Sequence, residues 1–336
     1  MGLGGDLMKL NNIKITNYRC FKEISIDFDE HTTLIVGRNG AGKTAILDAV
    51  AVSISTFLLG IDGAVSRTIS KDDARYEFHD LEGTIDPQHQ FPVSVDSRGD
   101  CLDKKNIKWV RSLNSEHSKT TIKDAAELTD IAKEVQNRIM TGDKSLILPL
   151  VSYYGTGRLY AQKKEKRNIQ SLTEFKRQVG YVDCMAAESN EKLMLNWFQI
   201  QTLKSLQEQQ KTGILDKPML LKTVEKAICK CFERISGSKN TRVFFDLDTH
   251  KLVLEFENED GNAQKFAMDE MSDGYKNTLS MIGDIAYRMA VLNPVLGNMV
   301  LEKTPGVILI DEIDLHLHPQ WQQTILSDLN AIFPNI

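Results

Sequence analysis

Cysteine is scarce in this sequence of 336 residues, and the five cysteines show no pattern. Only Cys229 and Cys231 lie close together, without a second pair or neighbouring histidines. An odd, scattered set argues against a disulfide framework and against a cysteine-based metal site. It favours reduced thiols, so we expect a cytoplasmic protein.

Long apolar runs, a signal peptide and an excess of positive charge are also lacking. No apolar run approaches the roughly 18 residues that a membrane-spanning helix needs. The leader Met1 to Leu7 has neither a basic nor an apolar segment. The net charge of −5 argues against a chain that coats nucleic acid over its whole surface, and it leaves a local basic patch open. We therefore expect no membrane partner.

The stretch from Gly37 to Thr44 matches the full phosphate-loop pattern G-x-x-x-x-G-K-[ST]. An apolar run at residues 33–36 precedes it and predicts a strand, and an apolar stretch at residues 45–59 follows it and predicts a helix. A chance glycine turn before a helix is the alternative, which the full pattern and both flanks disfavour. The sequence thus predicts a loop that binds a nucleotide.

Each residue type in this loop suits phosphate chemistry. Glycines let backbone N–H groups close on phosphate oxygens, and the helix N-terminus adds partial positive charge. The Lys43 ammonium can reach the β- and γ-phosphates, and the Thr44 hydroxyl can hold Mg²⁺. The expected cofactors are ATP and Mg²⁺. The expected contacts in the loop are Gly37, Asn39, Gly40, Ala41, Gly42, Lys43 and Thr44.

A second motif comes near the end of the chain, where an apolar strand predicted over residues 306–312 ends in two acids. Such a run is typical of a strand buried on both faces of a parallel sheet. Asp311 would order the Mg²⁺ shell, and Glu312 would polarise the attacking water. Taken alone, the acids could simply mark a strand end at the surface; the phosphate loop favours the catalytic interpretation. His316 and His318 lack a third ligand, so a loop that touches a partner is favoured over a metal site.

The remaining pattern predicts alternating strands and helices. Residues 60–121 are polar and irregular, with Asp86-Pro87 as a breaker. Predicted strands cover parts of 9–28 around a turn at 17–21, short stretches near 93–95 and 107–113, a buried run at 146–154, and a hairpin at 242–257. Predicted helices cover 122–140, 188–210, 218–234, 275–292 and 319–332.

Four stretches together resemble an ABC-type ATPase head of the branch that includes RecF, SMC proteins and OLD nucleases: 17–21, 37–44, 271–274 and 311–319. Three further stretches are similar to predicted ATP-binding proteins involved in virulence, a group that includes the PtuA ATPases of Septu and retron-linked antiphage systems: 153–159, 180–184 and 196–198. The resemblance covers most of the chain from Met8 onward.

This resemblance implies an α/β fold, namely a P-loop ABC-type ATPase head with a mixed β-sheet and an inserted helical lobe. The implied boundaries are 8–158 for the first ATPase half, 159–240 for the helical lobe and 241–336 for the second half. The family would next have a strand and a switch histidine. We therefore expect a C-terminally incomplete head, either a fragment or one with impaired hydrolysis.

The resemblance also implies site residues and a dimer that holds two ATP molecules between its heads. Ser272 and Gly274 match the signature loop, which would face the phosphate loop of the other subunit.

The resemblance assigns roles at the nucleotide as well. Arg19 matches a basic residue that contacts nucleotide, Glu312 and Lys43 would be catalytic, and Thr44 and Asp311 would hold the metal. From the residues alone, Ser272 is an N-cap candidate and Arg19 is an ordinary strand-end arginine. The linking glutamine could be Gln162 or lie in the turn at 154–158.

For partners, the resemblance implies an HNH-type nuclease (PtuB-like) and a retron reverse transcriptase with its DNA–RNA element. Nucleic acid stays open: the basic stretch 163–177 is its only local support, and a solvated helical face is favoured there. Other functions are a RecF- or SMC-like DNA-repair ATPase, a transporter motor, a one-chain nuclease, or an ATP-dependent interaction module without efficient hydrolysis. The lack of sustained heptads argues against the first of these functions, Asp273 in place of a glycine argues against the second, and the lack of a nuclease domain argues against the third. The interaction module stays open.

Overall fold

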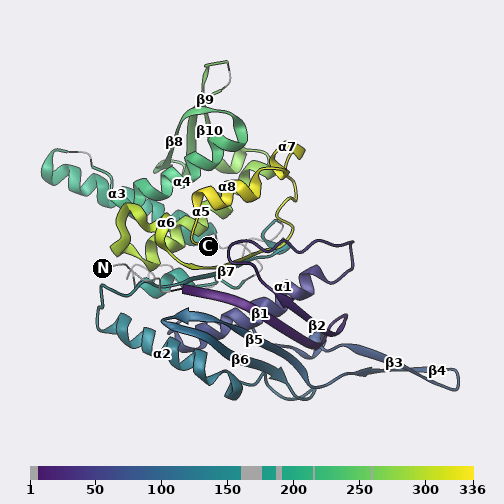
Figure 1. Cartoon of the computed structure of the whole chain (residues 1–336). Coiled ribbons are helices and arrows are strands. Elements are labelled where there is room, and N and C mark those ends of the chain that lie inside the picture. The colour runs from purple at the N-terminus through teal and green to yellow at the C-terminus, as the bar shows by residue number, and fades with distance from the viewer. Residues whose placement is uncertain (1–6, 160–175, 187–190, 215, 259) are drawn as a thin grey trace. The chain divides into compact units, whose positions relative to one another are not determined.

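The computed structural model describes residues 7–159, 176–186, 191–214, 216–258 and 260–336 (Figure 1). The chain forms two compact units that are interleaved along the sequence. The first unit comprises Met1–Tyr153, Tyr181–Met185 and Pro305–Asp311. The second unit comprises Tyr154–Gly180, Ala186–Thr304 and Glu312–Ile336. The domain boundaries expected from the sequence remain a prediction.

A four-stranded antiparallel sheet, in the order β2-β1-β5-β6, organises the first unit. Its strands are β1 (Leu7–Tyr18), β2 (Phe21–Asp27), β5 (Val93–Leu102) and β6 (Lys104–Leu113). Ile13 and Ile15 of β1 are fully buried, as their alternation with polar residues predicts. The strands predicted in residues 9–28 are confirmed, and those near 93–95 and 107–113 are confirmed and longer.

Helix α1 (Lys43–Ile54) and the 3₁₀ turn that follows it (Ser55–Gly60) are largely buried in the first unit. The Trp109 indole of β6 donates to the Ser53 carbonyl oxygen across 3.0 Å and so ties α1 to the sheet. Helix α2 (Ala126–Met140) is amphipathic and buries Leu128 and Ala132. Helix α1 was predicted from a continuous apolar stretch, and α2 from apolar residues at helical spacing.

Strands β7 (Leu150–Tyr154) and β11 (Gly306–Ile310) pair with each other. A Cβ at Gly306 would lie 2.1 Å from the Leu150 carbonyl oxygen, so this close pairing requires glycine. The expectation that β11 is buried on both faces was wrong: Leu309 is buried, and the other four residues are half-buried. An apolar run shows that a strand can be buried, but its neighbours decide whether it is.

The strand predicted at residues 33–36 is also absent from the described part of the chain: these residues have no regular structure, and Leu34 and Val36 are exposed. The described bonds near this segment are local, such as that from the Asp29 amide to Thr33 Oγ1. A strand needs a hydrogen-bonded neighbour, which four apolar residues cannot guarantee.

The polar region after α1 contains a hairpin that the sequence did not reveal. Its strands are β3 (Tyr76–Leu81) and β4 (Thr84–His89), which project from the first unit (Figure 1). Pro87 lies within β4 rather than breaking it, because a two-stranded hairpin has free edges on which a residue without an N–H is tolerated.

The second unit is mainly helical, with a three-stranded sheet in the order β10-β9-β8. Its helices are α3 (Glu191–Thr212), α4 (Met219–Ser236), α5 (Asp273–Leu292), α6 (Val300–Lys303), α7 (Pro319–Gln322) and α8 (Ile325–Ile332). Its strands are β8 (Lys239–Asp246), β9 (Lys251–Glu257) and β10 (Ala263–Ala267). Helix α5 is the most buried, and its Tyr287 contacts Trp197 of α3 edge-to-face.

Most elements of the second unit match the expectation, with one correction at the C-terminus. The helix predicted over 319–332 is two helices, α7 and α8. Between them, the Thr324 amide donates to the Trp321 carbonyl oxygen three residues back, at 3.1 Å. This tighter turn replaces the four-residue spacing of an α-helix and interrupts it.

Candidate nucleotide site

The phosphate loop bends sharply just before α1. Gly40 and Gly42 have φ angles of +80° and +92°, a backbone region that favours glycine. Asn39, Gly40 and Ala41 are exposed at the bend, and Gly42 is the N-cap of α1. The N-terminus of this 12-residue helix therefore presents the partial positive charge that attracts phosphate.

The packing around Gly42 also requires a glycine at this position. A Cβ there would lie 2.6 Å from both Cys20 Sγ and the tip of the Phe21 ring. The turn between β1 and β2 thus packs directly against the end of the loop. This contact links two of the stretches that carry the family resemblance.

The Lys43 side chain turns back over the loop. Its ammonium donates to the carbonyl oxygens of Gly37 and Arg38, at 2.7 and 3.1 Å. The charge is therefore held among the residues expected to surround phosphate. This position suits the predicted contact with the β- and γ-phosphates.

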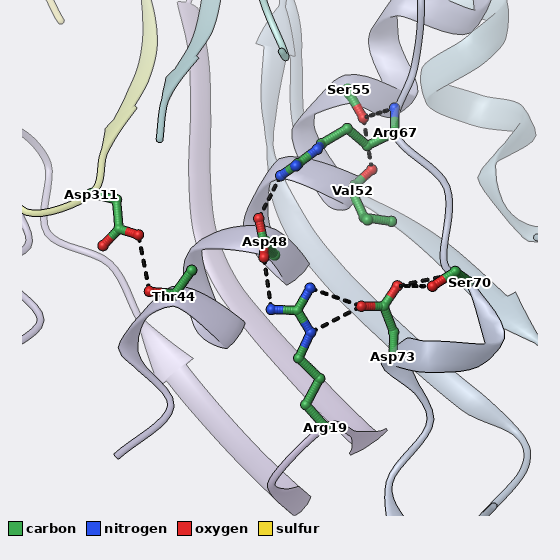
Figure 2. Close-up of polar contacts among 9 residues, drawn as sticks. All are labelled: Arg19, Thr44, Asp48, Val52, Ser55, Arg67, Ser70, Asp73 and Asp311. Carbon is green, nitrogen blue, oxygen red and sulfur yellow. Dashed lines mark hydrogen bonds and ion pairs between the residues drawn. The ribbon is translucent and has the colours of Figure 1, made fainter. Parts of the chain in front are cut away.

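Thr44 and Asp311 bring the two sequence motifs together within the first unit. The Thr44 hydroxyl donates to Asp311 Oδ2 across 2.9 Å (Figure 2). Asp311 is buried, and Thr44 is exposed. A hydroxyl and a carboxylate are oxygen donors of the kind that Mg²⁺ prefers, so this pair fits the predicted metal position.

Glu312 follows Asp311 directly and is exposed. Its φ of +46° is unusual for a residue with a side chain, and it turns the chain sharply after β11. The Leu315 amide donates to its carbonyl oxygen at 3.1 Å and closes this turn. The catalytic role of Glu312 remains a prediction.

Arg19 is held in an ionic cluster, which we call the Arg19 cluster and define as Arg19, Asp48, Arg67 and Asp73 (Figure 2). Arg19 contacts Asp48 Oδ2 at 2.7 Å and Asp73 Oδ1 at 2.9 Å. Arg67 contacts the other oxygen of Asp48 at 2.6 Å. Both carboxylates are largely buried, and the two arginines balance their charge. Arg19 is thus more than an ordinary strand-end arginine, and its predicted contact with nucleotide stays a prediction.

The cluster changes the ionisation of its neighbours. Burial raises the pKa of Tyr153, and the nearby Asp48 carboxylate adds to this effect. Burial opposes the charge of Arg19, but Tyr18, Asp48 and Asp73 outweigh it and raise the pKa of the guanidinium. The tyrosine therefore stays neutral and the arginine charged at physiological pH.

Sequence reasoning missed Asp48, Arg67 and Asp73. Asp48 carried a signal, because it is the lone acid in the otherwise apolar helix α1, one turn after Thr44. Arg67 and Asp73 lie in an irregular segment, and no spacing rule points to them. Their ion pairs depend on how that segment folds back onto α1.

The signature residues lie in the second unit, at the start of α5. Ser272 is the N-cap of α5, which its sequence allowed, but its hydroxyl makes no capping bond. A Cβ at Gly274 would lie 2.5 Å from the His316 carbonyl oxygen. Gly274 therefore has a packing role between α5 and the segment after β11, and its predicted contact with a second subunit remains a prediction.

Two expected features lie outside the described residues. These are Gln162, a candidate for the linking glutamine, and most of the basic stretch 163–177. Of that stretch, Lys176 and Arg177 are described; Lys176 is exposed, and the Arg177 guanidinium donates to the Leu292 carbonyl oxygen at 2.6 Å. This contact serves the interior of the second unit rather than a nucleic-acid surface.

Comparison with known proteins assigns this chain to a family. A family model described as an AAA domain matches residues 12–236. The chain belongs to the AAA domain family. Membership of the AAA domain family supports ATP binding by the loop and ATPase activity in general, and it agrees with the predicted α/β P-loop fold.

Curated relatives of this AAA domain protein come from retron and Septu systems. It is 24% identical to the Retron Vc95 probable ATPase of Vibrio cholerae serotype O1 biovar El Tor, covering 98% of this chain and 69% of that protein. It is 22% identical to the Septu protein PtuA of Bacillus thuringiensis, covering 98% of this chain and 70% of that protein. The predicted resemblance to this group of ATPases is confirmed.

A solved structure titled as the recombination mediator protein RecF-ATP in the RecFOR pathway is also similar. It has 13% sequence identity and a TM-score of 0.46, and the match covers 99% of this chain and 92% of that chain.

The expectation that no apolar run approaches the length of a membrane-spanning helix was wrong for one helical stretch of the AAA domain: Lys43–Gly60 is long and apolar enough by length and composition. It is the helix that follows the phosphate loop, and 72% of it is buried inside the structure. A core helix passes the same test, so this is weak evidence for a membrane span.

In the part of the chain that the structure describes, no group of three His, Cys, Asp or Glu side chains could hold a metal. A metal at Thr44 and Asp311 would therefore need further ligands from phosphate or water.

Proposed function

We propose that this chain is an Mg·ATP-dependent ATPase that dimerises across its nucleotides and controls a separate nuclease in antiphage defence. The observation that carries the proposal is the hydrogen bond between Thr44 and Asp311, which joins the phosphate loop to the acidic strand end. The names of the retron and Septu relatives support the defence setting. A cytoplasmic location belongs to the same proposal.

Within this proposal, Lys43 and the loop amides bind and orient the triphosphate. Gly37, Asn39, Gly40, Ala41 and Gly42 supply the backbone that closes around it. The α1 N-terminus and the Lys43 ammonium stabilise negative charge that grows on the γ-phosphate during ATP hydrolysis.

Thr44 and Asp311 would hold Mg²⁺, which would neutralise charge on the β- and γ-phosphates when bound. Glu312 would accept a proton from the attacking water and orient it. Arg19 would contact the nucleotide from its cluster. Ser272 and Gly274 would face the nucleotide of a second subunit, with the α5 N-terminus adding positive charge.

Two variants test the catalytic part. Lys43→Ala removes the ammonium and is expected to abolish measurable ATP binding in calorimetry. Glu312→Gln keeps the shape and removes the base, so it is expected to bind Mg·ATP, lose turnover and accumulate as a dimer in light scattering. Equal ATP affinity for Lys43→Ala and the wild type would rule the site out. A monomeric Glu312→Gln protein at saturating Mg·ATP would rule out the dimer.

The partner part of the proposal has its own test. The full chain is co-expressed with the product of its neighbouring gene, and a stable complex with nuclease activity is the expected result. A retron reverse transcriptase and its DNA–RNA element are further partners to assay in the same way. If the chain hydrolyses ATP but binds none of these partners, it is an ATPase that controls no nuclease, and this part of the proposal is contradicted.

A further inference from the structure

The β3–β4 hairpin presents an exposed apolar face that nothing in the nucleotide site uses. The cross-strand pairs Tyr76–His89 and Phe78–Pro87 place these side chains on one face, together with Ile85. Phe78 is 70% exposed, Ile85 68% and Tyr76 46%. The Tyr76 ring stacks near the Phe78 ring. It also contacts the His89 ring, and the centroids of these two rings are 4.0 Å apart. The face is thus a preordered aromatic stripe, of the kind that marks interaction sites.

The same hairpin is strongly acidic. Between Tyr76 and His89 the sequence has four acids and neither lysine nor arginine. The acids are Glu77, Asp80, Glu82 and Asp86. Arg75, just before β3, contacts Glu77 at 2.9 Å and offsets only one of them. Asp80 lies on the same face as the stripe, opposite Ile85, whereas Glu77 and Asp86 lie on the other face of the hairpin and Glu82 lies in its turn. The arm that carries the stripe is therefore negatively charged.

The base of the hairpin is anchored to the turn that carries Arg19. The Arg75 amide donates to the Asn17 carbonyl oxygen at 2.9 Å, and the Arg19 amide donates to the Asp73 carbonyl oxygen at 2.7 Å. Tyr18 and Ala74 form an isolated antiparallel bridge. Asp73 thus takes part both in this base and in the Arg19 cluster, so the hairpin has a rigid connection to helix α1.

We propose that the β3–β4 hairpin is a docking arm for a partner protein whose surface is apolar and flanked by lysine or arginine. Its aromatic stripe would be covered by apolar side chains, and its acids would pair with the basic rim. The phosphates of a nucleic acid would be repelled by the four acids, and so would the same arm of a second copy of this chain. The inference rests on the proposed function and deepens it: the nuclease partner is the protein that we expect here, because proteins that bind nucleic acid carry such basic surfaces.

The test uses the full chain and the co-expressed product of its neighbouring gene. The hairpin variant is Phe78→Asp with Ile85→Asp, which places charge on the stripe. Met140→Asp is the matched control, because Met140 is 71% exposed at the end of α2. We expect the hairpin variant to bind the partner about tenfold or more weakly, and the control to bind like the wild type. Circular dichroism and Mg·ATP affinity should be unchanged in both.

A second variant, in which the four acids become Asn or Gln, should slow association at low salt and reduce the salt dependence. If the wild type binds no partner, the proposed function fails and this inference fails with it. If the wild type and the hairpin variant bind the partner equally, only the inference is overturned. It is also overturned if the hairpin variant keeps its partner but loses self-association in light scattering, or loses binding to a labelled DNA duplex.

Discussion

The Thr44 hydroxyl lies 2.9 Å from Asp311 Oδ2, although the two residues are 267 positions apart in the chain. Each belongs to a motif that is recognisable alone, and only the first unit of the fold makes them neighbours. Their hydrogen bond orients two oxygen donors toward each other at the N-terminus of α1. A hydroxyl and a carboxylate are oxygen ligands of the kind that Mg²⁺ prefers, so the pair fits the predicted metal position.

This pairing predicts coupled effects on Mg²⁺. Thr44→Val and Asp311→Asn should each weaken Mg·ATP binding by at least about tenfold, because each removes a donor oxygen. The double variant should lose less than the two single losses combined, because both residues act on one ion. Calorimetry at several Mg²⁺ concentrations measures this. Fully additive losses that do not depend on Mg²⁺ would contradict the shared position.

The Arg19 cluster predicts a stability effect. Asp48→Ala should lower the free energy of unfolding by about 3 kcal/mol, because it leaves Arg19 and Arg67 facing each other without their shared carboxylate. Urea denaturation measures the change. Asp130→Ala is the control: its pair with Lys133 is exposed on both sides, so the loss should be below about 0.5 kcal/mol. Equal effects of the two variants would show that the cluster contributes nothing.

Gly274 predicts a packing effect that needs no nucleotide. Gly274→Ala would place a Cβ 2.5 Å from the His316 backbone, which cannot easily yield, and should destabilise the protein by about 1–3 kcal/mol. Gly283→Ala in the same helix meets the flexible Met194 side chain at 2.8 Å and gains helix propensity, so its loss should be smaller. Thermal melting of both variants without ATP tests this. A Gly274→Ala protein of wild-type stability would leave only the signature role.

The cysteines predict a selective labelling pattern. Cys20 is exposed and packs near Gly42 at the end of the phosphate loop, so it should react first with a thiol reagent at pH 8 and be protected by Mg·ATP. Cys101 and Cys231 are buried, and burial raises the pKa of both thiols to about 12, so these two should react only on unfolding. Mass spectrometry after brief labelling identifies the site. Cys20→Ser is the control, and early labelling of any buried thiol would contradict the assignment.

The same thiol shifts have a consequence for stability. A thiol whose pKa is higher in the folded than in the unfolded protein stabilises the fold below the unfolded value, here 9, and loses this contribution as the pH rises toward about 12. The free energy of unfolding should therefore decline over this range. Serine at Cys101 and Cys231 should reduce the decline, and an unchanged slope in that variant would contradict the role of the thiols.

Local patterns predicted the elements well where a short stretch decides its own conformation. The helices around Leu128 and Ile282 follow from apolar spacing, the helix around Ile46 follows from a continuous apolar stretch, and the bend at Gly40 and Gly42 follows from glycines that tolerate a positive φ. Prediction was wrong at residues 33–36, and it missed the β3–β4 hairpin. In both cases pairing between strands decides the outcome, and pairing depends on which neighbours are available.

By itself, the sequence determined the chemistry: a lysine and a hydroxyl beside a glycine loop, and two acids after an apolar strand. Tertiary structure alone decided that Thr44 meets Asp311, that Arg19 is shared by Asp48 and Asp73, and that Gly274 packs on His316. The physical reason is the distance along the chain over which each kind of interaction acts. Backbone conformation and apolar periodicity act over a few residues, whereas a hydrogen bond or an ion pair between distant side chains exists only after the intervening chain has folded.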